Sequence, residues 1–299
     1  MPNESSVSNR ILDPEFLRKL ERLAIAAKRV RLGFAKGERR SKRKGSSVEF
    51  ADYRDYVQGD DLRFVDWNIF GRLDALYLKL FMEQEDLTVH LLIDASRSMG
   101  FGTPPKIDFA CKIAAAIGYI ALVGYDRVSV EAFTGTDTYR MRPCRGKASG
   151  AKLFSFIESI GAEGGTHLEQ ACRSYVIRNR AKGVAVLISD FFDEEGFESC
   201  LRRLTQSGSD LYAIHVLAPE EIDPQLSGDL KLLDSETSVF TEVSTSRALL
   251  KRYKQNLDGF CEGIRRFCLA RGIGHFVASS DMPVEQLTLG VLRHGGMLR

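Results

Sequence analysis

An aspartate and two serines occupy alternate positions in the segment Asp94-Ala95-Ser96-Arg97-Ser98. Residues 87–93, with the sequence LTVHLLI, are apolar enough to form a buried strand, so these polar side chains follow its carboxyl end. The alternate spacing lets their oxygens turn toward one point. Hard divalent cations prefer such ligands, and Mg²⁺ takes six oxygens at about 2.1 Å while keeping several waters. The pattern predicts part of a magnesium site.

Two further segments can complete such a site. In Glu163-Gly164-Gly165-Thr166 the glycines allow close backbone approach and the threonine offers a hydroxyl, while Asp190 follows an apolar run at 184–188. In a doubly wound sheet, loops at the carboxyl ends of the strands converge on one edge. The predicted metal ligands are Asp94, Ser96, Ser98, Thr166 and Asp190. In the alternative interpretation, the two acids cap loops and the hydroxyls are ordinary turn residues.

The chemistry of this set favours binding over catalysis. Two carboxylates balance the charge of Mg²⁺, and an open coordination position can accept an acidic side chain from a partner. His167 follows Thr166, but no evident carboxylate orients it as a base, so we do not expect an enzyme. A Mg²⁺-dependent phosphoryl-transfer enzyme is an alternative, although Ser96 stands where a second acid would be expected. No G-x-x-x-x-G-K-[ST] phosphate loop is present, which disfavours an ATPase.

The elements that must position these residues follow from the hydrophobic pattern. Apolar strands alternate with helices from residue 86 to residue 299, which predicts an α/β domain with a doubly wound, mainly parallel six-stranded sheet. A hairpin is expected as an insertion at about 219–243. The expected strands are 87–93, 127–133, 138–142, 184–188, 211–217 and 274–278. One helix is expected after the cap Thr103-Pro104-Pro105, with an apolar face from Ile107 to Ala121, and further helices are expected at 152–160, 168–179, 196–206 and 246–271.

The N-terminal part of the chain is basic. Residues 1–50 contain 13 Lys and Arg against 6 Asp and Glu, a net charge of +7, whereas the whole chain carries +2. Asp13-Pro14 predicts the start of a helix with apolar positions through Val30, and Gly33 can end it. We expect 1–47 to be this helix and a mobile basic loop. The loop residues Arg39, Arg40, Lys42, Arg43 and Lys44 can contact solvent, an acidic protein surface or, as a further alternative, nucleic acid.

Residues 48–85 are rich in aromatic side chains and turn residues, which predicts an accessory β-rich segment with a strand at 76–81. Trp67 and its aromatic neighbours can pack this segment onto the sheet. Alternatively, Trp67 and Arg63 can belong to a second binding face.

The site motif resembles the metal-ion-dependent adhesion site (MIDAS) of von Willebrand factor A domains: D-x-S-x-S at Asp94, a threonine in G-G-T at Thr166, and a strand-end S-D at Asp190. The flanking blocks 48–56, 59–63, 65–68 and 83–85 resemble the bacterial domain-of-unknown-function family fifty-eight. This resemblance implies a von Willebrand factor A-like domain and a partnership with a MoxR-type AAA+ ATPase, in which the chain acts as an adaptor in a chaperone-like assembly. Beside the metal, the residues expected to contact the partner are Arg97, Met99 and His167.

The composition excludes a collagen, a mucin, a coiled coil and a wholly disordered chain. Hydrophobic residues make up 44% and charged residues 27%, as in ordinary globular proteins, and no apolar run is long enough to span a membrane. The six cysteines form no C-x-x-C pair, so we expect thiols in a reducing compartment. Together with a polar N-terminus, these features predict a cytoplasmic protein.

Overall fold

The structure is a computed structural model that describes residues 11–26, 48–83, 87–135, 137–179, 182–193, 195–226, 228–233, 240–244 and 246–299. The chain divides into two compact units, one made of Met1–Arg29 with Leu87–Arg299 and the other of Val30–Asp86. We call them the sheet unit and the aromatic unit. The basic loop that contains Arg39, Arg40, Lys42, Arg43 and Lys44 lies outside the described residues. Its role stays a prediction.

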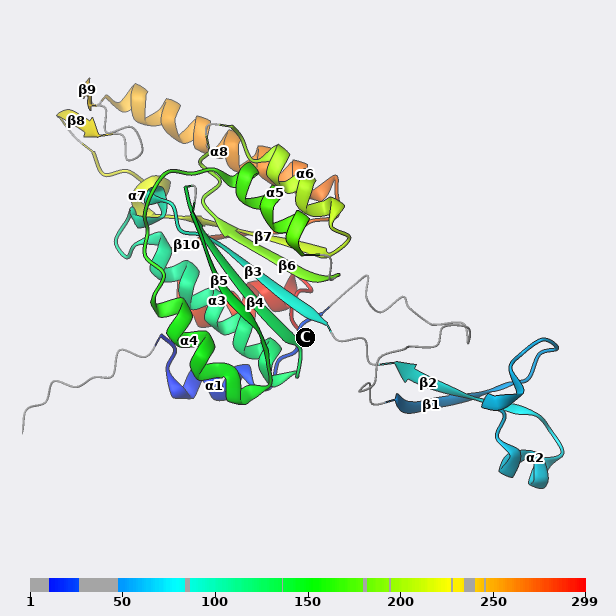
Figure 1. The fold of residues 1–299 in the computed structure, drawn as a ribbon. Helices are drawn as coiled ribbons and strands as arrows, with labels where there is room; N and C mark the ends of the chain where they lie inside the picture. The colour runs from blue at the N-terminus through cyan, green and yellow to red at the C-terminus, as the bar shows by residue number, and fades with distance from the viewer. Residues whose placement is uncertain are drawn as a thin grey trace, which may run out of the picture. The chain divides into compact units, whose positions relative to one another are not determined.

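The sheet unit is built on a six-stranded sheet with the order β10–β7–β6–β3–β4–β5 (Figure 1). All neighbouring pairs are parallel except β4–β5, which is antiparallel. The predicted α/β class and mainly parallel sheet are therefore confirmed. The strands are β3 (Thr88–Asp94), β4 (Arg127–Thr134), β5 (Asp137–Arg145), β6 (Gly183–Ser189), β7 (Asp210–Leu217) and β10 (Gly274–Ser279).

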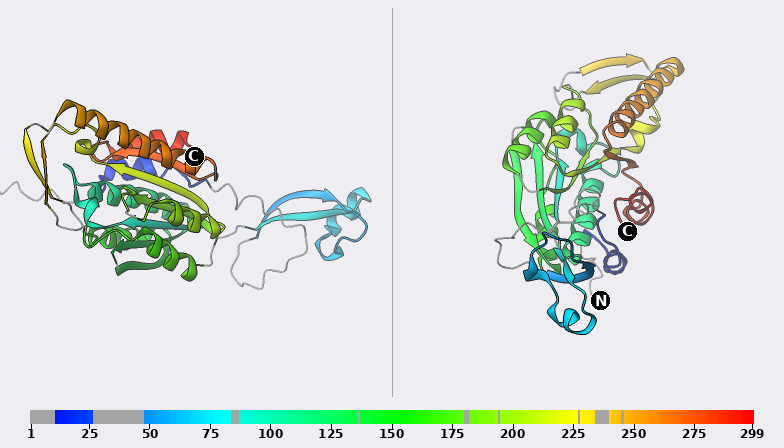
Figure 2. Two further views of the ribbon diagram at one scale, coloured as in Figure 1. Left: turned by 90° about the horizontal axis from the view of Figure 1, so that it is seen from above. Right: turned by 90° about the vertical axis from the view of Figure 1, so that its right-hand side faces the viewer.

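Helices cover both faces of the sheet, each face with its own hydrophobic core (Figures 1 and 2). Every residue of β3, β6 and β7 is buried, because strands sandwiched between two helical layers have no solvent-facing side. One face carries α1 (Pro14–Leu20), α3 (Lys106–Val123), α4 (Gly150–Glu158) and a π-helical segment (Gln286–Leu292). The other face carries α5 (Leu168–Arg178), α6 (Glu198–Gln206) and α8 (Arg247–Leu269).

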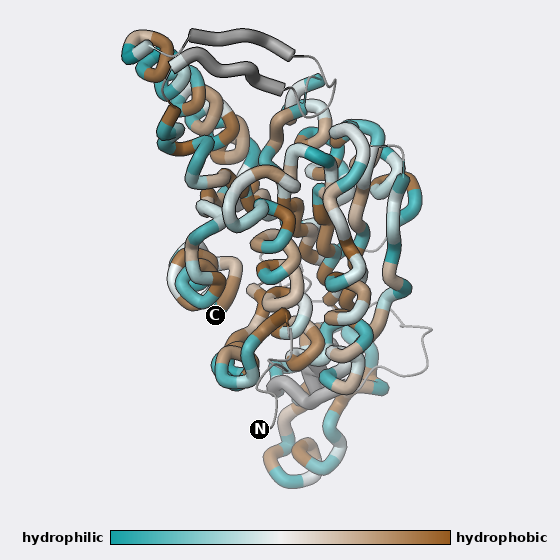
Figure 3. Tube along the Cα trace, turned by 90° about the vertical axis from the view of Figure 1, so that its left-hand side faces the viewer, coloured by the Kyte–Doolittle hydropathy of each residue, from teal (hydrophilic) through white to brown (hydrophobic). Residues whose placement is uncertain are grey.

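Two of these helices differ in their burial. Helix α3 is buried along most of its length because it packs against strands as well as α1 and α4. Helix α8 alternates hydrophobic and hydrophilic residues around its axis, as Figure 3 shows, and buries only Leu257, Ile264 and Cys268. It is therefore an outer helix with one apolar stripe.

The first helix is shorter than predicted. It ends at Leu20, and the chain then becomes extended and pairs with the C-terminus. Ala24 and Arg299 exchange two backbone hydrogen bonds of 3.0 Å, and Ile25 forms a bridge with Leu298. The apolar positions after Leu20 therefore serve this pairing and the core instead of extending a helix face. Of the residues that continued the predicted periodicity, Ala27 and Val30 lie outside the described residues.

The strand order places the candidate site at a switch point. From β3 the chain continues to β4 and β5 on one side, and β6 then pairs with the other side of β3. At such a reversal, the loops after the two neighbouring strands diverge and leave room for a ligand. Asp94 ends β3 and Asp190 directly follows β6.

The aromatic unit contains an antiparallel pair of strands, β1 (Val48–Asp55) and β2 (Tyr77–Glu83), and the helix α2 (Trp67–Leu73) between them. Asp66 organises it: its carboxylate accepts hydrogen bonds from the backbone of Asn68 and Ile69, which caps α2, and from the Tyr53 hydroxyl. The structure therefore has two strands in this segment, together with a helix, α2, that was not predicted.

Two smaller features complete the described chain. The short helix α7 (Pro219–Ile222) follows β7, and β8 (Asp229–Leu233) pairs with β9 (Phe240–Ser244) as an antiparallel hairpin before α8. In the part of the chain that the structure describes, no helix is long and apolar enough to cross a membrane.

Candidate functional site

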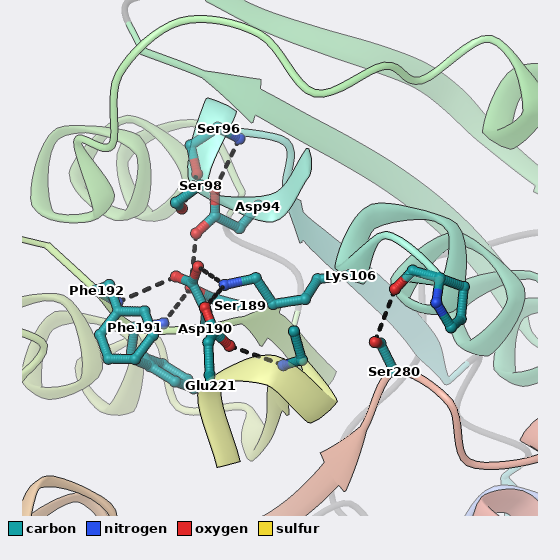
Figure 4. A network of polar contacts seen from close by, with 12 residues as sticks. Asp94, Ser96, Ser98, Lys106, Ser189, Asp190, Phe191, Phe192, Glu221 and Ser280 are labelled. Carbon is teal, nitrogen blue, oxygen red and sulfur yellow. Dashed lines mark hydrogen bonds and ion pairs between the residues drawn. The ribbon is translucent and has the colours of Figure 1, made fainter. Parts of the chain in front are cut away.

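Asp94 is completely buried at the carboxyl end of β3, and both of its oxygens are hydrogen-bonded. Oδ1 accepts the backbone N–H of Ser96 at 3.0 Å, and Oδ2 accepts the hydroxyl of Ser189 at 2.6 Å (Figure 4). The first bond shapes the loop after β3, and the second comes from the last residue of the neighbouring strand. The hydroxyl oxygens of Ser96 and Ser98 lie 3.1 Å apart in the same loop.

Asp190, also fully buried, is bound to a lysine. The ammonium Nζ of Lys106 donates to Asp190 Oδ2 at 2.7 Å and to Glu221 Oε1 at 2.6 Å (Figure 4). The other oxygen of Asp190 accepts the backbone N–H of Phe192 at 3.0 Å. Lys106 begins α3, and Glu221 lies on α7. Three elements distant in sequence therefore meet in one ionic cluster.

The loop that carries Thr166 is bonded to both neighbouring loops. The N–H of Arg97 donates to the carbonyl of Gly164 at 3.0 Å, and the N–H of Glu163 donates to the carbonyl of Ala95 at 2.8 Å. On the other side, Asp193 accepts the N–H of Leu168 at 2.8 Å. The loops after β3 and β6 and the loop before α5 are thus held together, and Thr166 is buried within this assembly.

Burial and charge repulsion perturb Asp94. Loss of hydration raises the pKa of Asp94 to about 7, with repulsion from Asp190 as the second cause, and the hydrogen bonds from Ser189 and Ser96 oppose that rise. The pKa of Glu221 is also raised, mainly by burial, against the opposing attraction of Lys106. Two buried acids that repel each other form a place where additional positive charge is stabilising.

The donor set fits a hard divalent cation in its chemistry. Carboxylates and hydroxyls are the oxygen ligands that Mg²⁺ and Mn²⁺ accept. Among the described residues, no three His, Cys, Asp or Glu side chains gather in a way that could hold a metal, so a cation at this edge would depend on the serine and threonine hydroxyls. The residues that would hold it are the predicted set: Asp94, Ser96, Ser98, Thr166 and Asp190.

Comparison with known proteins places the chain in a family. The family model described as "Protein of unknown function DUF58" matches residues 52–258. The chain belongs to the DUF58 family. Among curated DUF58-like relatives, uncharacterized proteins of Mycobacterium tuberculosis and Mycobacterium bovis are 28% identical over 250 residues, which is 82% of this chain and 78% of theirs.

Solved structures with partial likeness to this DUF58 chain include the conserved hypothetical protein BatB from Bacteroides thetaiotaomicron. It is 15% identical with a TM-score of 0.45, and the match covers 70% of this chain and 98% of BatB. A von Willebrand factor type A protein from Catenulispora acidiphila is 14% identical with a TM-score of 0.40, and that match covers 72% of this chain and 43% of the other.

The residues predicted to contact a partner fall into three groups in this DUF58 chain. Arg97 and His167 are exposed, on the loop after β3 and at the start of α5. Met99 is fully buried in the hydrophobic core, so the expectation that its side chain contacts a partner does not fit the structure. Arg63 and Trp67 are exposed in the aromatic unit, Trp67 to 58%.

Sequence reasoning missed the basic half of the site. From the sequence, Lys106 is expected in the first turn of an apolar helix and Glu221 in an inserted hairpin. A lysine three residues after Thr103 and just past two prolines resembles an ordinary first-turn residue. Its complete burial is visible only when β6 and α7 are in place. Phe101 and Phe192 flank the ammonium, with ring centroids 5.9 Å and 5.3 Å from Nζ.

Proposed function

We propose that this chain is a protein-binding module whose binding face is the carboxyl edge of the sheet around Asp94 and Asp190. The observation that carries the proposal is the convergence of these two buried acids at the switch point, beside the Ser96 and Ser98 hydroxyls. In this proposal Mg²⁺ or Mn²⁺ binds to the predicted ligand set. Bound there, the ion supplies an electrophilic centre with a position for an acidic side chain of the partner.

The rim of this edge has exposed groups of several kinds. Arg97 and His167 are exposed, and Phe101, whose ring lies beside Lys106, is a 50% exposed residue. A cationic, an aromatic and an imidazole side chain can each contact a partner that presents an acid. A partner carboxylate bound to the metal has a direction set by the metal's coordination geometry. An exposed ion pair lacks this constraint and contributes only about 0–1 kcal/mol.

The partner class that we propose is a MoxR-type AAA+ ATPase or a client of one, in a chaperone-like assembly. This part of the proposal comes from the family resemblance. The six free cysteines support a reducing, cytoplasmic setting for that assembly.

Catalysis is the weaker alternative. A Mg²⁺-dependent phosphoryl-transfer enzyme needs a group free to move a proton or to bind phosphate. In the described site both oxygens of Asp94 and of Asp190 accept hydrogen bonds, and Lys106 is held by two carboxylates. This arrangement supports a binding site that is already formed.

The test measures binding of the purified chain to a purified MoxR-type ATPase from the same organism, with Mg²⁺ and with a chelator. We expect chelation and Asp94→Asn to abolish binding, and Ser98→Ala and Thr166→Ala to weaken it while thermal unfolding stays cooperative. Asp258→Asn on the exposed face of α8 and Ser155→Ala on α4 are the matched controls, and both should bind normally. Binding that survives both chelation and Asp94→Asn would show that the metal-centred face is not the interface.

A further inference from the structure

Lys106 is a fully buried cation within the candidate metal site. Its side chain is 1% exposed, and its ammonium is bound by Asp190 at 2.7 Å and Glu221 at 2.6 Å. Burying an ammonium is strongly unfavourable unless it is paired and hydrogen-bonded. The two carboxylates and the rings of Phe101 and Phe192 meet that requirement. These contacts therefore stabilise a buried positive charge at this point.

The ammonium of Lys106 binds a carboxylate that is also a predicted metal ligand. Asp190 is one of the two acids expected to balance a divalent cation, yet Oδ2 is bound by Lys106 and Oδ1 by the N–H of Phe192. A cation that binds Asp190 must share this carboxylate with the ammonium or displace it. Both cations would then share one carboxylate, and like charges repel strongly where water is excluded.

We propose that Lys106 is a tethered cation that competes with the divalent ion for Asp190 and sets the metal affinity of the site. This inference rests on the proposed function, because it concerns the same ligand set. When no metal is bound, the ammonium of Lys106 compensates the negative charge of Asp190. It makes metal binding weak and reversible, so that a partner's acidic side chain contributes a large share of the stability of the metal-bridged complex.

Glu221 is the second half of this device. Its Oε2 accepts the N–H of Ala218 at 2.7 Å, which fixes the carboxylate at the start of α7, and its Oε1 faces the ammonium. Glu221 therefore gives Lys106 an anionic partner other than Asp190. Without that partner the ammonium would depend on Asp190 alone and would hold it more tightly.

Substitutions of Lys106 and Glu221 should therefore have opposite effects on Mn²⁺ affinity, which calorimetry on the full chain measures. Lys106→Met should bind Mn²⁺ about tenfold more tightly than the wild type, since a nearby positive charge is removed. Glu221→Gln should bind several-fold more weakly. Lys112→Met, an exposed lysine on the same helix, should leave the affinity unchanged.

A matched control separates contact from general charge. Glu220 is adjacent to Glu221 and carries the same charge, but it is exposed and accepts the N–H of Thr103 at 3.1 Å. Glu220→Gln should therefore change Mn²⁺ affinity much less than Glu221→Gln. In the Lys106→Met background, Asp94→Asn should abolish the tighter binding, which would locate the ion at this site.

The outcomes are decisive in both directions. If Lys106→Met binds Mn²⁺ no more tightly than the wild type, the competition is refuted, even if metal-dependent partner binding stands. If Lys106→Met does not fold, Glu221→Gln becomes the deciding variant. The inference is refuted if Glu221→Gln binds Mn²⁺ as tightly as the wild type or more tightly. It is also refuted if Glu221→Gln and Glu220→Gln bind Mn²⁺ with equal affinity. Mn²⁺ binding by Lys106→Met alone would support the inference and would contradict a metal-dependent function of the wild-type chain.

Discussion

The hydroxyl of Ser189 donates a 2.6 Å hydrogen bond to Oδ2 of Asp94 and thereby joins the ends of β6 and β3. Both residues are completely buried. Ser189 Oγ also accepts the N–H of Phe191 at 2.8 Å, so one hydroxyl connects an acid of the site to the loop that follows Asp190. The geometry of the candidate site therefore depends on a serine outside the predicted ligand set.

Removing this hydroxyl should destabilise the chain. Ser189→Ala leaves a buried carboxylate oxygen and a backbone N–H without their partner, which costs about 1–3 kcal/mol. Urea unfolding measures this as a lower midpoint with an unchanged slope. Ser155→Ala, at an exposed position of α4, is the control and should unfold like the wild type. Equal stability of Ser189→Ala and the wild type would mean that the bond is unimportant.

His215 should make the folded state sensitive to acid. It is fully buried on β7, and burial lowers its pKa to about 3 from an ordinary 6.5, with His275 and Lys106 adding repulsion. Because the folded state resists protonation, the stability that His215 contributes is complete above pH 6.5. It is lost as the pH falls from 6.5 toward 3, by about 1.4 kcal/mol per pH unit.

The difference between the wild type and His215→Phe isolates this effect, because Asp94 acts in the opposite direction. Its raised pKa means that the folded state gains stability relative to the unfolded state as the pH falls below 7. We expect the free energy of unfolding of the wild type to fall relative to that of His215→Phe by about 1.4 kcal/mol between pH 7.5 and pH 5.5. Ser155→Ala, an exposed position that does not titrate, is the control and should show no such relative change. A pH-independent difference for His215→Phe would contradict the prediction.

Glu131 should stabilise the contact between β4 and the end of α5. Its carboxylate accepts hydrogen bonds from Arg178 at 2.7 Å and from Asn179 at 3.0 Å, and only 10% of its side chain is exposed. Glu131→Gln removes the charge while keeping the shape, and should lower the free energy of unfolding by about 1–3 kcal/mol. Glu262, on the outer surface of α8, pairs with Arg265 and Arg266. Glu262→Gln is the control and should leave the unfolding midpoint nearly unchanged.

Gly183 should be intolerant of any side chain. A Cβ at this position would overlap the backbone oxygen of Thr88, its partner in the β3–β6 pairing. Backbone atoms cannot move aside as a flexible side chain can, so Gly183→Ala should destabilise the chain by at least about 1–3 kcal/mol. Thermal unfolding checks this against Gly161→Ala, where a Cβ would meet no atom within 4 Å. A melting temperature equal to that of the control would refute the clash.

Much of the sheet unit could be predicted because its signals are local. A strand buried on both faces is apolar throughout, and a helix repeats its apolar positions at helical spacing, so both patterns are readable within short windows. Asp94 and Asp190 follow such strands directly. Once a parallel sheet is inferred, the common direction of its strands brings both acids to one edge.

Less of the aromatic unit could be predicted from the sequence. Its strands were expected, but α2 was not, because Asp66 caps a helix that has no buried face. The burial of Met99 also depends on the core beneath the loop, since its neighbours Arg97 and Gly100 are exposed.

The sequence by itself determined the α/β class, the strand-end acids and the hydroxyl spacing, because each is set by residues close together in the chain. The tertiary structure alone decided the charge balance of the site. Lys106 is 84 residues from Asp190 and 115 residues from Glu221, and a lysine at the start of a helix ordinarily points into solvent. Its burial is stable only because two carboxylates from distant elements compensate the lost hydration of the ammonium, and no local pattern encodes that meeting.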